Sequence, residues 1–166
     1  GDITLRADDF DFNSAASTQV LGTGAFTLEP LGDDFDVDIS YPSANLSVAS
    51  TITGLTIGKA SSADGTSDAN VTVGGATSIA GPINIYGGDI TVNENLTSNL
   101  SEAAILLQAS GNIGTANSVK TIATTNGNIS LIGDADANGS GSLDLDFTDY
   151  EAGTGNILFR GETFSW

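Results

Sequence analysis

The stretch GPINIYGGDITVNE, residues 81–94, decides the fold because it holds two consecutive copies of one short pattern. Each copy begins with a glycine and then places apolar residues at alternate positions, Ile83 and Ile85 in the first and Ile90 and Val92 in the second. Strict alternation is typical of a β-strand that buries one face. The stretch therefore predicts two short strands with a sharp turn between them.

The same pattern recurs along the chain, which makes it an internal repeat. It is present without gaps at residues 1–7, 24–30, 44–50, 53–59, 69–75, 81–87, 88–94, 103–109, 127–133, 141–147 and 155–161, and without the glycine as FDVDIS at 35–40. The pairs expected to face inward are Ile3/Leu5, Phe26/Leu28, Val37/Ile39, Leu46/Val48, Leu55/Ile57, Val71/Val73, Ile83/Ile85, Ile90/Val92, Ile105/Leu107, Ile129/Leu131, Leu143/Leu145 and Ile157/Phe159.

One segment, residues 98–108, is rich enough in alanine to allow a single helical turn instead of a strand. We favour the strand, because Ile105, Leu107 and Ala109 fall on the same repeat positions as Ile3, Leu5 and Ala7. The fold class predicted for the whole chain is therefore all-β.

The spacing of the strands favours a β-solenoid over a sandwich of matched hairpins. Most strands follow one another at irregular short intervals, and turn words such as Asn-Gly at 126 and 138 supply sharp corners. Three strands per coil of about 20–25 residues give about seven coils in a single segment, residues 1–166. The chain begins inside one repeat and stops soon after another, so we expect a segment of a longer solenoid or a subunit that stacks end to end.

Charge and composition exclude several classes of partner. Four basic residues against twenty-one acidic ones give a net charge of −17, which opposes binding to nucleic acids and to anionic membranes. The longest purely apolar run, residues 103–107, is far shorter than the roughly 20 residues of a membrane-spanning helix. We therefore expect neither nucleic-acid binding nor membrane insertion.

The chain contains no cysteine, histidine or methionine. Disulfides, thiolate or imidazole metal sites, and nucleophilic catalysis by a Ser-His-Asp or Cys-His arrangement are excluded by this inventory. Oxygen ligands remain, and with them a hard cation such as calcium.

Several longer segments resemble the repeats of very large bacterial exoproteins of the filamentous-haemagglutinin type: LTIGKASSADGTSDANVTVGG (55–75), IAGPINIYGGDITVNENLTS (79–98), ILLQASGNI (105–113) and TTNGNISLIGDADANGSGSLDL (124–145). The likeness covers nearly the whole chain. It implies a right-handed parallel β-helix that is exported and serves as an adhesin or as a surface or matrix fibre.

The strongest candidate site is a calcium loop around DADANGSG. Oxygens at alternate positions around a tight turn can converge on calcium, and the candidate ligands are Asp134, Asp136, Asn138, Ser140 and Asp144. A full calcium loop of the helix–loop–helix kind would need a glutamate where Leu145 stands. The alternative is a turn rich in Asp and Asn that only reverses the chain.

A second candidate is the density of carboxylates on two expected strands, with Asp34, Asp36 and Asp38 on one and Asp144 and Asp146 on the other. A solvated acidic face is the plain interpretation, and paired carboxylates of a carbohydrate-processing enzyme are the alternative. Aromatic residues expected at the surface, Tyr41, Tyr86, Tyr150 and Trp166, are the type that stacks on sugars.

The sequence as a whole favours a structural, non-catalytic module of a secreted or surface-bound bacterial adhesin. Its partner would be a host, neighbouring-cell or matrix surface, glycans included. The alternative is a self-assembling extracellular fibre subunit that joins end to end through its terminal strands. Carbohydrate binding or processing is the third hypothesis.

Overall fold

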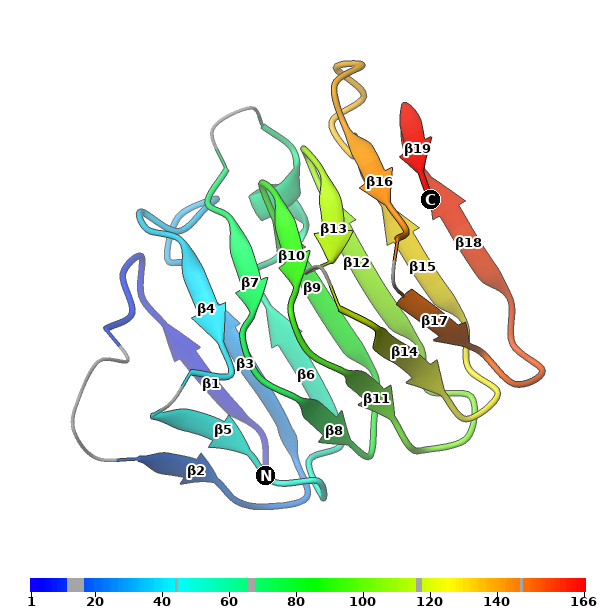
Figure 1. The fold of residues 1–166 in the computed structure, drawn as a ribbon. Helices are drawn as coiled ribbons and strands as arrows, with labels where there is room; N and C mark the ends of the chain where they lie inside the picture. Colours follow the sequence, from blue (N-terminus) through cyan, green and yellow to red (C-terminus); the bar gives the residue numbers. More distant parts are fainter. Residues whose placement is uncertain (12–16, 44, 66–67, 116–117, 147) are drawn as a thin grey trace.

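The alternating apolar residues form two continuous ladders along one sheet of a parallel β-solenoid. A computed structural model describes residues 1–11, 17–43, 45–65, 68–115, 118–146 and 148–166. The first sheet has seven parallel strands, which follow one another from the N-terminal to the C-terminal end (Figure 1): β1 (Ile3–Arg6), β3 (Ala25–Glu29), β6 (Gly54–Ile57), β9 (Ile83–Gly87), β12 (Ile105–Ala109), β15 (Ile129–Ile132) and β18 (Ile157–Arg160).

The remaining strands form three further parallel sheets. The second sheet contains β4 (Ile39–Tyr41), β7 (Val71–Val73), β10 (Ile90–Val92), β13 (Ile113–Thr115), β16 (Ser142–Asp144) and β19 (Thr163–Ser165). The third contains β8 (Thr77–Ile79), β11 (Leu96–Ser98), β14 (Lys120–Thr124) and β17 (Thr148–Glu151), and β2 (Thr18–Val20) pairs with β5 (Leu46–Val48).

Register along the first sheet keeps like residues above one another. One ladder runs through Ile3, Phe26, Leu55, Ile83, Ile105, Ile129 and Ile157, and the other through Leu5, Leu28, Ile57, Ile85, Leu107, Leu131 and Phe159. The interior members are almost completely buried and belong to one hydrophobic cluster. The core is therefore made by stacking coils, as the repeat predicts, and the strand preferred for residues 105–109 is confirmed.

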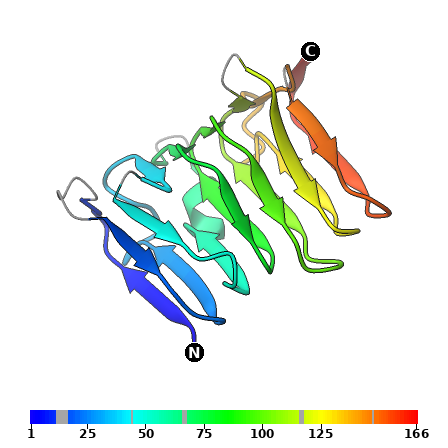
Figure 2. The same ribbon diagram turned by 60° about the horizontal axis from the view of Figure 1, so that its bottom comes forward.

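The solenoid completes about six turns between β1 and β18 (Figure 2). The turns vary in length, from 22 residues between Ile83 and Ile105 to 29 between Phe26 and Leu55. These lengths reach beyond the range expected from the repeat, which is why fewer turns than seven fit. A short 3-10 helix, η1 (Ala60–Ala63), is the one helical element of the described residues, and no helix among them is long and apolar enough to cross a bilayer.

The FDVDIS segment departs from the predicted strand. Pairing begins only at Ile39, and Phe35 and Ile39 are buried whereas Val37 is 38% exposed. The inward pair Val37/Ile39 is thus wrong for Val37, because the chain is still turning at this position. At the two ends, Ile3, Leu5 and Ile157 lie on the predicted ladders but stay about 40% exposed, since a terminal coil is covered on one side only.

Candidate functional site

A ladder of Asp and Asn side chains lines the corner between the first and second sheets. Asp38, Asn70, Asp89 and Asn112 each stand directly before a strand of the second sheet, and Ser142 begins the next one. We call each of these residues a rung of the corner ladder. From the second rung on, the backbone nitrogen donates a hydrogen bond of 2.7–3.0 Å to the side-chain oxygen of the rung before it, and this holds for Asn70, Asp89, Asn112 and Ser142. Each side chain therefore binds the backbone of the following coil at its corner.

The turns at this corner differ greatly in length. The turn from β9 to β10 covers only residues 88–89 and the turn from β12 to β13 residues 110–112, whereas residues 58–70 and 133–141 form the turns before β7 and β16. The two short turns are therefore flanked by longer ones. Gly111 leaves room for the Asp89 side chain in the short turn, because a Cβ at this position would lie 2.3 Å from the Asp89 Oδ1 atom and would displace it.

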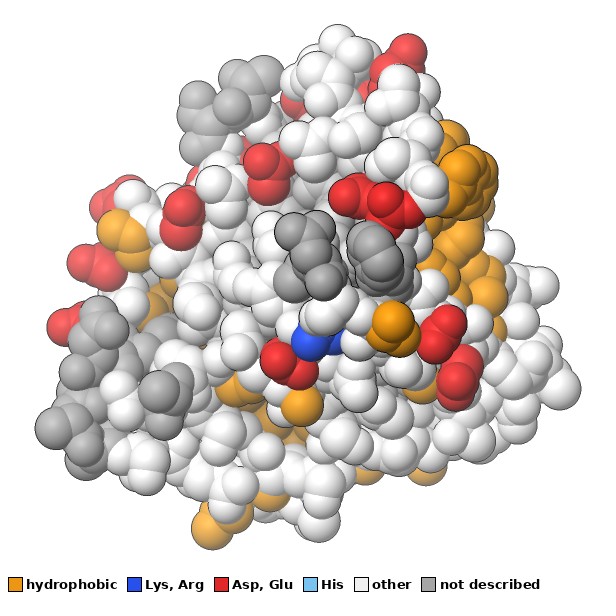
Figure 3. Space-filling model, in the orientation of Figure 1, with side chains coloured by type: hydrophobic (Ala, Val, Ile, Leu, Met, Phe, Trp, Pro, Cys, Tyr) orange, Lys and Arg blue, Asp and Glu red, His pale blue; other side chains and the backbone are white. Residues whose placement is uncertain are grey.

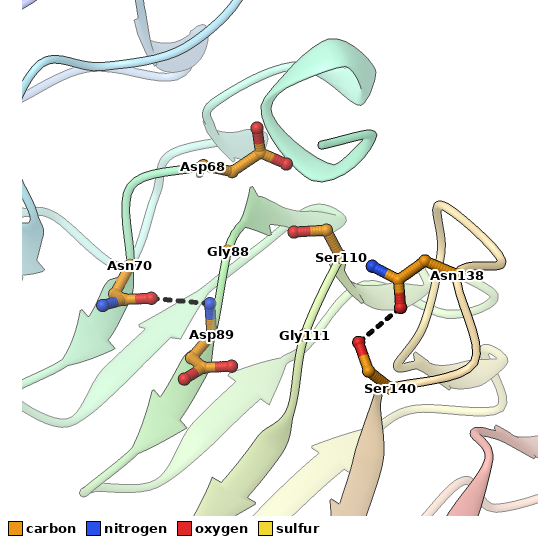
Figure 4. A pocket seen from close by; sticks show the side chains of 8 residues that line it. All are labelled: Asp68, Asn70, Gly88, Asp89, Ser110, Gly111, Asn138 and Ser140. Carbon is orange, nitrogen blue, oxygen red and sulfur yellow. Dashed lines mark hydrogen bonds between the residues drawn. The ribbon is translucent and has the colours of Figure 1, made fainter. Parts of the chain in front are cut away.

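A polar hollow of about 160 Å³ lies where the two long turns rise on either side of the short ones (Figure 4). Four successive coils contribute to it, and no described basic residue lines it. The lining consists of Asp68, Asn70, Gly88, Asp89, Ser110, Gly111, Asn138 and Ser140.

The hydrogen bonds of the lining leave specific groups available. Asn70 uses its oxygen for the Asp89 nitrogen, and Asn138 accepts a hydrogen bond from the Ser140 hydroxyl. One carboxylate oxygen of Asp89 accepts from Asn112, and one oxygen of Asp68 accepts from the Gly65 nitrogen at 2.8 Å. The second oxygen of each carboxylate has no hydrogen-bond partner among the described residues.

Ser110 is the most buried polar residue of the hollow, with 4% of its surface exposed. Its backbone nitrogen donates to the Gly87 oxygen at 3.1 Å, but its hydroxyl makes no hydrogen bond to any described residue. Figure 4 shows this hydroxyl directed toward the coil that carries Gly88 and Asp89, with Asp68 on the neighbouring coil beyond it. The hydroxyl itself is open to the hollow and not sealed in the core, so a ligand or water can bind it there.

The candidate calcium ligands Asp134, Asp136, Asn138 and Ser140 lie together in the loop between β15 and β16. The Asp134 Oδ1 atom accepts from the Gly139 nitrogen at 2.9 Å, and the Asp136 Oδ2 atom accepts from the Asn138 side chain at 2.6 Å. These are the bonds of the Asx-rich turn that the sequence offered as the alternative.

Asp144, the fifth candidate ligand, lies on β16, and its Oδ1 atom accepts from the Asp146 nitrogen at 3.1 Å. Within the described part of the chain, no group of three or more acidic side chains is placed to hold a metal ion. Calcium binding by this loop stays a prediction, with Asn138 and Ser140 shared between the loop and the hollow.

The acidic row Asp34, Asp36 and Asp38 lies in a turn, not on the outward face of a strand as the sequence predicts. Asp38 is the first rung of the corner ladder. Asp34 accepts a hydrogen bond from the Ala69 nitrogen, and its Oδ1 atom is buried without a partner. Burial raises the pKa of the Asp34 carboxyl, and the nearby charges of Asp68 and Asp36 act in the same direction.

The aromatic residues that the sequence places at the surface differ in how deeply they are buried. Tyr41 is 1% exposed and lies in the core, where burial raises the pKa of its hydroxyl. Tyr150 is half-buried and packs edge-on against Phe159, with ring centroids 4.8 Å apart. Trp166 is 82% exposed and stacks on Phe164. Sugar stacking by Tyr41 is therefore ruled out.

Sequence reasoning missed Asp68, Asp89 and Ser110, although part of the signal is present. The words ANV (69–71), GDI (88–90) and GNI (111–113) place Asp or Asn before the first inward residue of a strand. That recurrence predicts a ladder. The hollow itself depends on unequal turn lengths, which the repeat does not specify.

Comparison of this chain with protein-family models, with curated proteins and with solved structures finds no match.

Proposed function

We propose that this chain is a structural, non-catalytic module of an extracellular bacterial adhesin of the filamentous-haemagglutinin type. The observation that supports it best is the uninterrupted stack of parallel coils on two apolar ladders of seven residues each. Six turns at about 4.8 Å each extend the solenoid by about 29 Å. Such a stack works as a spacer whose corners and loops meet a partner.

The surface chemistry supports an extracellular partner, such as a host cell, a neighbouring cell or a matrix. Acidic side chains are spread over the face seen in Figure 3, consistent with the net charge of −17. A field of this sign favours solubility and attracts cationic ligands. A secreted or surface-bound location accords with this, and the absence of His and Cys from the sequence supports a non-catalytic role.

Adhesion is tested with beads coated with the purified 166-residue chain. Coated beads are expected to adhere to bacterial matrix or to cultured cells more than albumin-coated beads do. The matched control is the Ile105→Asp variant, which places a charge in the core and should unfold the chain without adding a positive charge. Equal adhesion of chain-coated and albumin-coated beads would overturn the adhesin proposal.

A separate assay tests the proposal that the chain has no catalytic activity. The folded chain is incubated with a panel of bacterial and host polysaccharides, and new reducing ends and unsaturated ends are measured. No release above the heat-treated chain is expected. Release that disappears in Asp34→Asn, Asp36→Asn or Asp144→Asn would instead establish a carbohydrate-processing enzyme.

A second candidate function, the self-assembling fibre subunit, is favoured by the apolar residues at both ends. Ile3 and Leu5 are exposed on β1, and Ile157, Leu158, Phe164 and Trp166 are exposed on the last coil. Stacking a second copy would continue both ladders of the first sheet. Negative-stain electron microscopy at moderate salt distinguishes the two functions, because a fibre subunit forms filaments and an adhesin module remains a short rod.

A further inference from the structure

We propose that the hollow at the corner between the first and second sheets binds a single amine-bearing sugar unit, a hexosamine. This inference deepens the proposed adhesin function and rests on it for its biological meaning. It stands structurally on the unpartnered hydroxyl of Ser110 and on the free carboxylate oxygens of Asp68 and Asp89.

The size of the hollow favours one sugar ring. Sites for drug-sized ligands occupy about 300–1,000 Å³, whereas this hollow measures about 160 Å³. Two long turns form its sides, and the short turns at Gly88 and Gly111 form its floor. A longer saccharide would place one ring in the hollow and leave its neighbours outside.

The available groups are acceptors and hydroxyls. Asp68 and Asp89 each offer one carboxylate oxygen, Ser110 offers a hydroxyl that both donates and accepts, and Ser140 retains acceptor capacity after donating to Asn138. This set matches a ligand that presents several hydroxyl donors around one ring. Hydrogen bonds to the carboxylates would be charge-assisted and hence the strongest of the site.

Charge selects an amine-bearing ring over a neutral one. Two carboxylates line the hollow, no described basic side chain lies against it, and the whole chain carries −17. A protonated amine would neutralise part of this local charge, and the long-range field would speed its approach. Calcium needs six to eight oxygen ligands and favours sites with several carboxylates, whereas Asp68 and Asp89 are the two carboxylates among the described residues that line the hollow.

The test compares two matched ligands by isothermal titration calorimetry at low salt and at a pH where the amine is protonated. The glucosamine trisaccharide carries the charges, and the N-acetylglucosamine trisaccharide has the same rings without them. Saturable binding of the glucosamine trisaccharide is expected, with the acetylated ligand at least roughly tenfold weaker, as expected for loss of a charge-assisted hydrogen bond.

Three variants locate the binding. Asp68→Asn and Asp89→Asn keep an oxygen that can accept the structural hydrogen bonds, so the fold is retained, and each should weaken binding roughly tenfold. Ser110→Ala should weaken it a few-fold. The control Asp149→Asn removes an exposed carboxylate from β17 in the third sheet and should leave affinity unchanged.

Equal binding of the two trisaccharides, no saturable binding, or equal losses in Asp149→Asn and Asp89→Asn would each overturn the hexosamine site. Competition by millimolar calcium, beyond that of sodium chloride at matched ionic strength and retained in the Asp134→Asn variant, would assign the hollow to a cation and also overturn it. Bead adhesion separates this inference from the adhesin proposal. Adhesion retained by the Asp68→Asn/Asp89→Asn double variant overturns the hollow as the adhesive site and leaves the adhesin function standing.

Discussion

The Oδ1 atom of Asp89 accepts two hydrogen bonds from Asn112, one from its backbone nitrogen at 2.7 Å and one from its side-chain amide at 3.2 Å. The same arrangement recurs one coil further, because the side-chain oxygen of Asn112 accepts hydrogen bonds from the backbone nitrogen and the hydroxyl of Ser142. The corners at Asn70, Asp89, Asn112 and Ser142 are thus each held by a side chain of the coil before. This relationship explains why either Asp or Asn can occupy a rung, since only an acceptor oxygen is needed.

The Asn112→Ala variant should lower the free energy of unfolding by about 1 kcal/mol, because it removes the acceptor of two hydrogen bonds. Urea unfolding measures the change. Asn112→Asp keeps the acceptor and is the matched control, expected to lose less than Asn112→Ala at high salt. Equal losses in the two variants would show that the ladder does not stabilise the corner.

Truncation of a central ladder residue should cost far more than truncation of a terminal one. Ile105 is completely buried between Ile83 and Ile129, so Ile105→Ala should lose about 2–5 kcal/mol. Ile157 lies on the same ladder but is 43% exposed, and Ile157→Ala should lose less than half as much. Similar losses at both positions would contradict a core built by stacking.

Gly81 should not tolerate a larger residue, because two successive coils approach each other closely at this position. A Cβ at this position would lie 1.8 Å from the Thr53 carbonyl oxygen of the preceding coil, so Gly81→Ala should destabilise the chain by about 1–3 kcal/mol. Gly32→Ala is the control, because a Cβ there meets no atom within 4 Å and should change stability by no more than about 0.5 kcal/mol. Thermal unfolding of the two variants provides the comparison.

The first sheet could be predicted from the sequence because every one of its strands carries two apolar residues separated by one position. The third sheet could not be predicted in this way. Its strands are short and pair residues such as Ile79 with Ser98 and Thr124, so the inward position is often a buried hydroxyl. The Ser98 hydroxyl donates to the Gly81 oxygen at 2.8 Å, a tertiary contact that no local pattern indicates.

The candidate site was predictable only in part, for a related reason. The dense local motif DADANGSG indicates Asn138 and Ser140, whereas Asp68 and Ser110 come to line one hollow only when coils of unequal turn length are stacked. Local sequence specifies the rungs, and the lengths of the turns before β7 and β16 specify the hollow. The FDVDIS error has the same origin, since a long turn continues through residues that alternate like a strand.

The pH dependence of stability should carry a contribution from Asp34. Its folded-state pKa is raised above 3.8 chiefly by burial, so the folded chain holds this proton more tightly than the unfolded chain. The contribution is fully present below pH 3.8 and is lost as the pH rises through the folded-state pKa. Asp34→Asn removes this dependence, so its melting temperature relative to the unsubstituted chain should rise with pH across that window. Asp149→Asn controls for net charge, and a difference that is constant with pH would contradict the role of Asp34.

Calcium should raise the melting temperature if the loop from Asp134 to Ser140 binds it. Sodium chloride alone is expected to stabilise the chain, because screening relieves the self-repulsion of a net charge of −17. The relevant measurement is therefore millimolar calcium against sodium chloride of equal ionic strength, followed by chelator. We expect the additional shift to be reversed by chelation.

The Asp134→Asn variant separates a calcium loop from a plain turn. Its side-chain oxygen can still accept from the Gly139 and Ser140 nitrogens, so the turn is retained while the charge that a calcium ion needs is removed. The additional calcium shift should disappear in Asp134→Asn and persist in Asp149→Asn. If the unsubstituted chain melts at the same temperature in calcium and in matched sodium chloride, the loop does not bind calcium. DADANGSG is then a turn that is held by its own hydrogen bonds and only reverses the chain between β15 and β16.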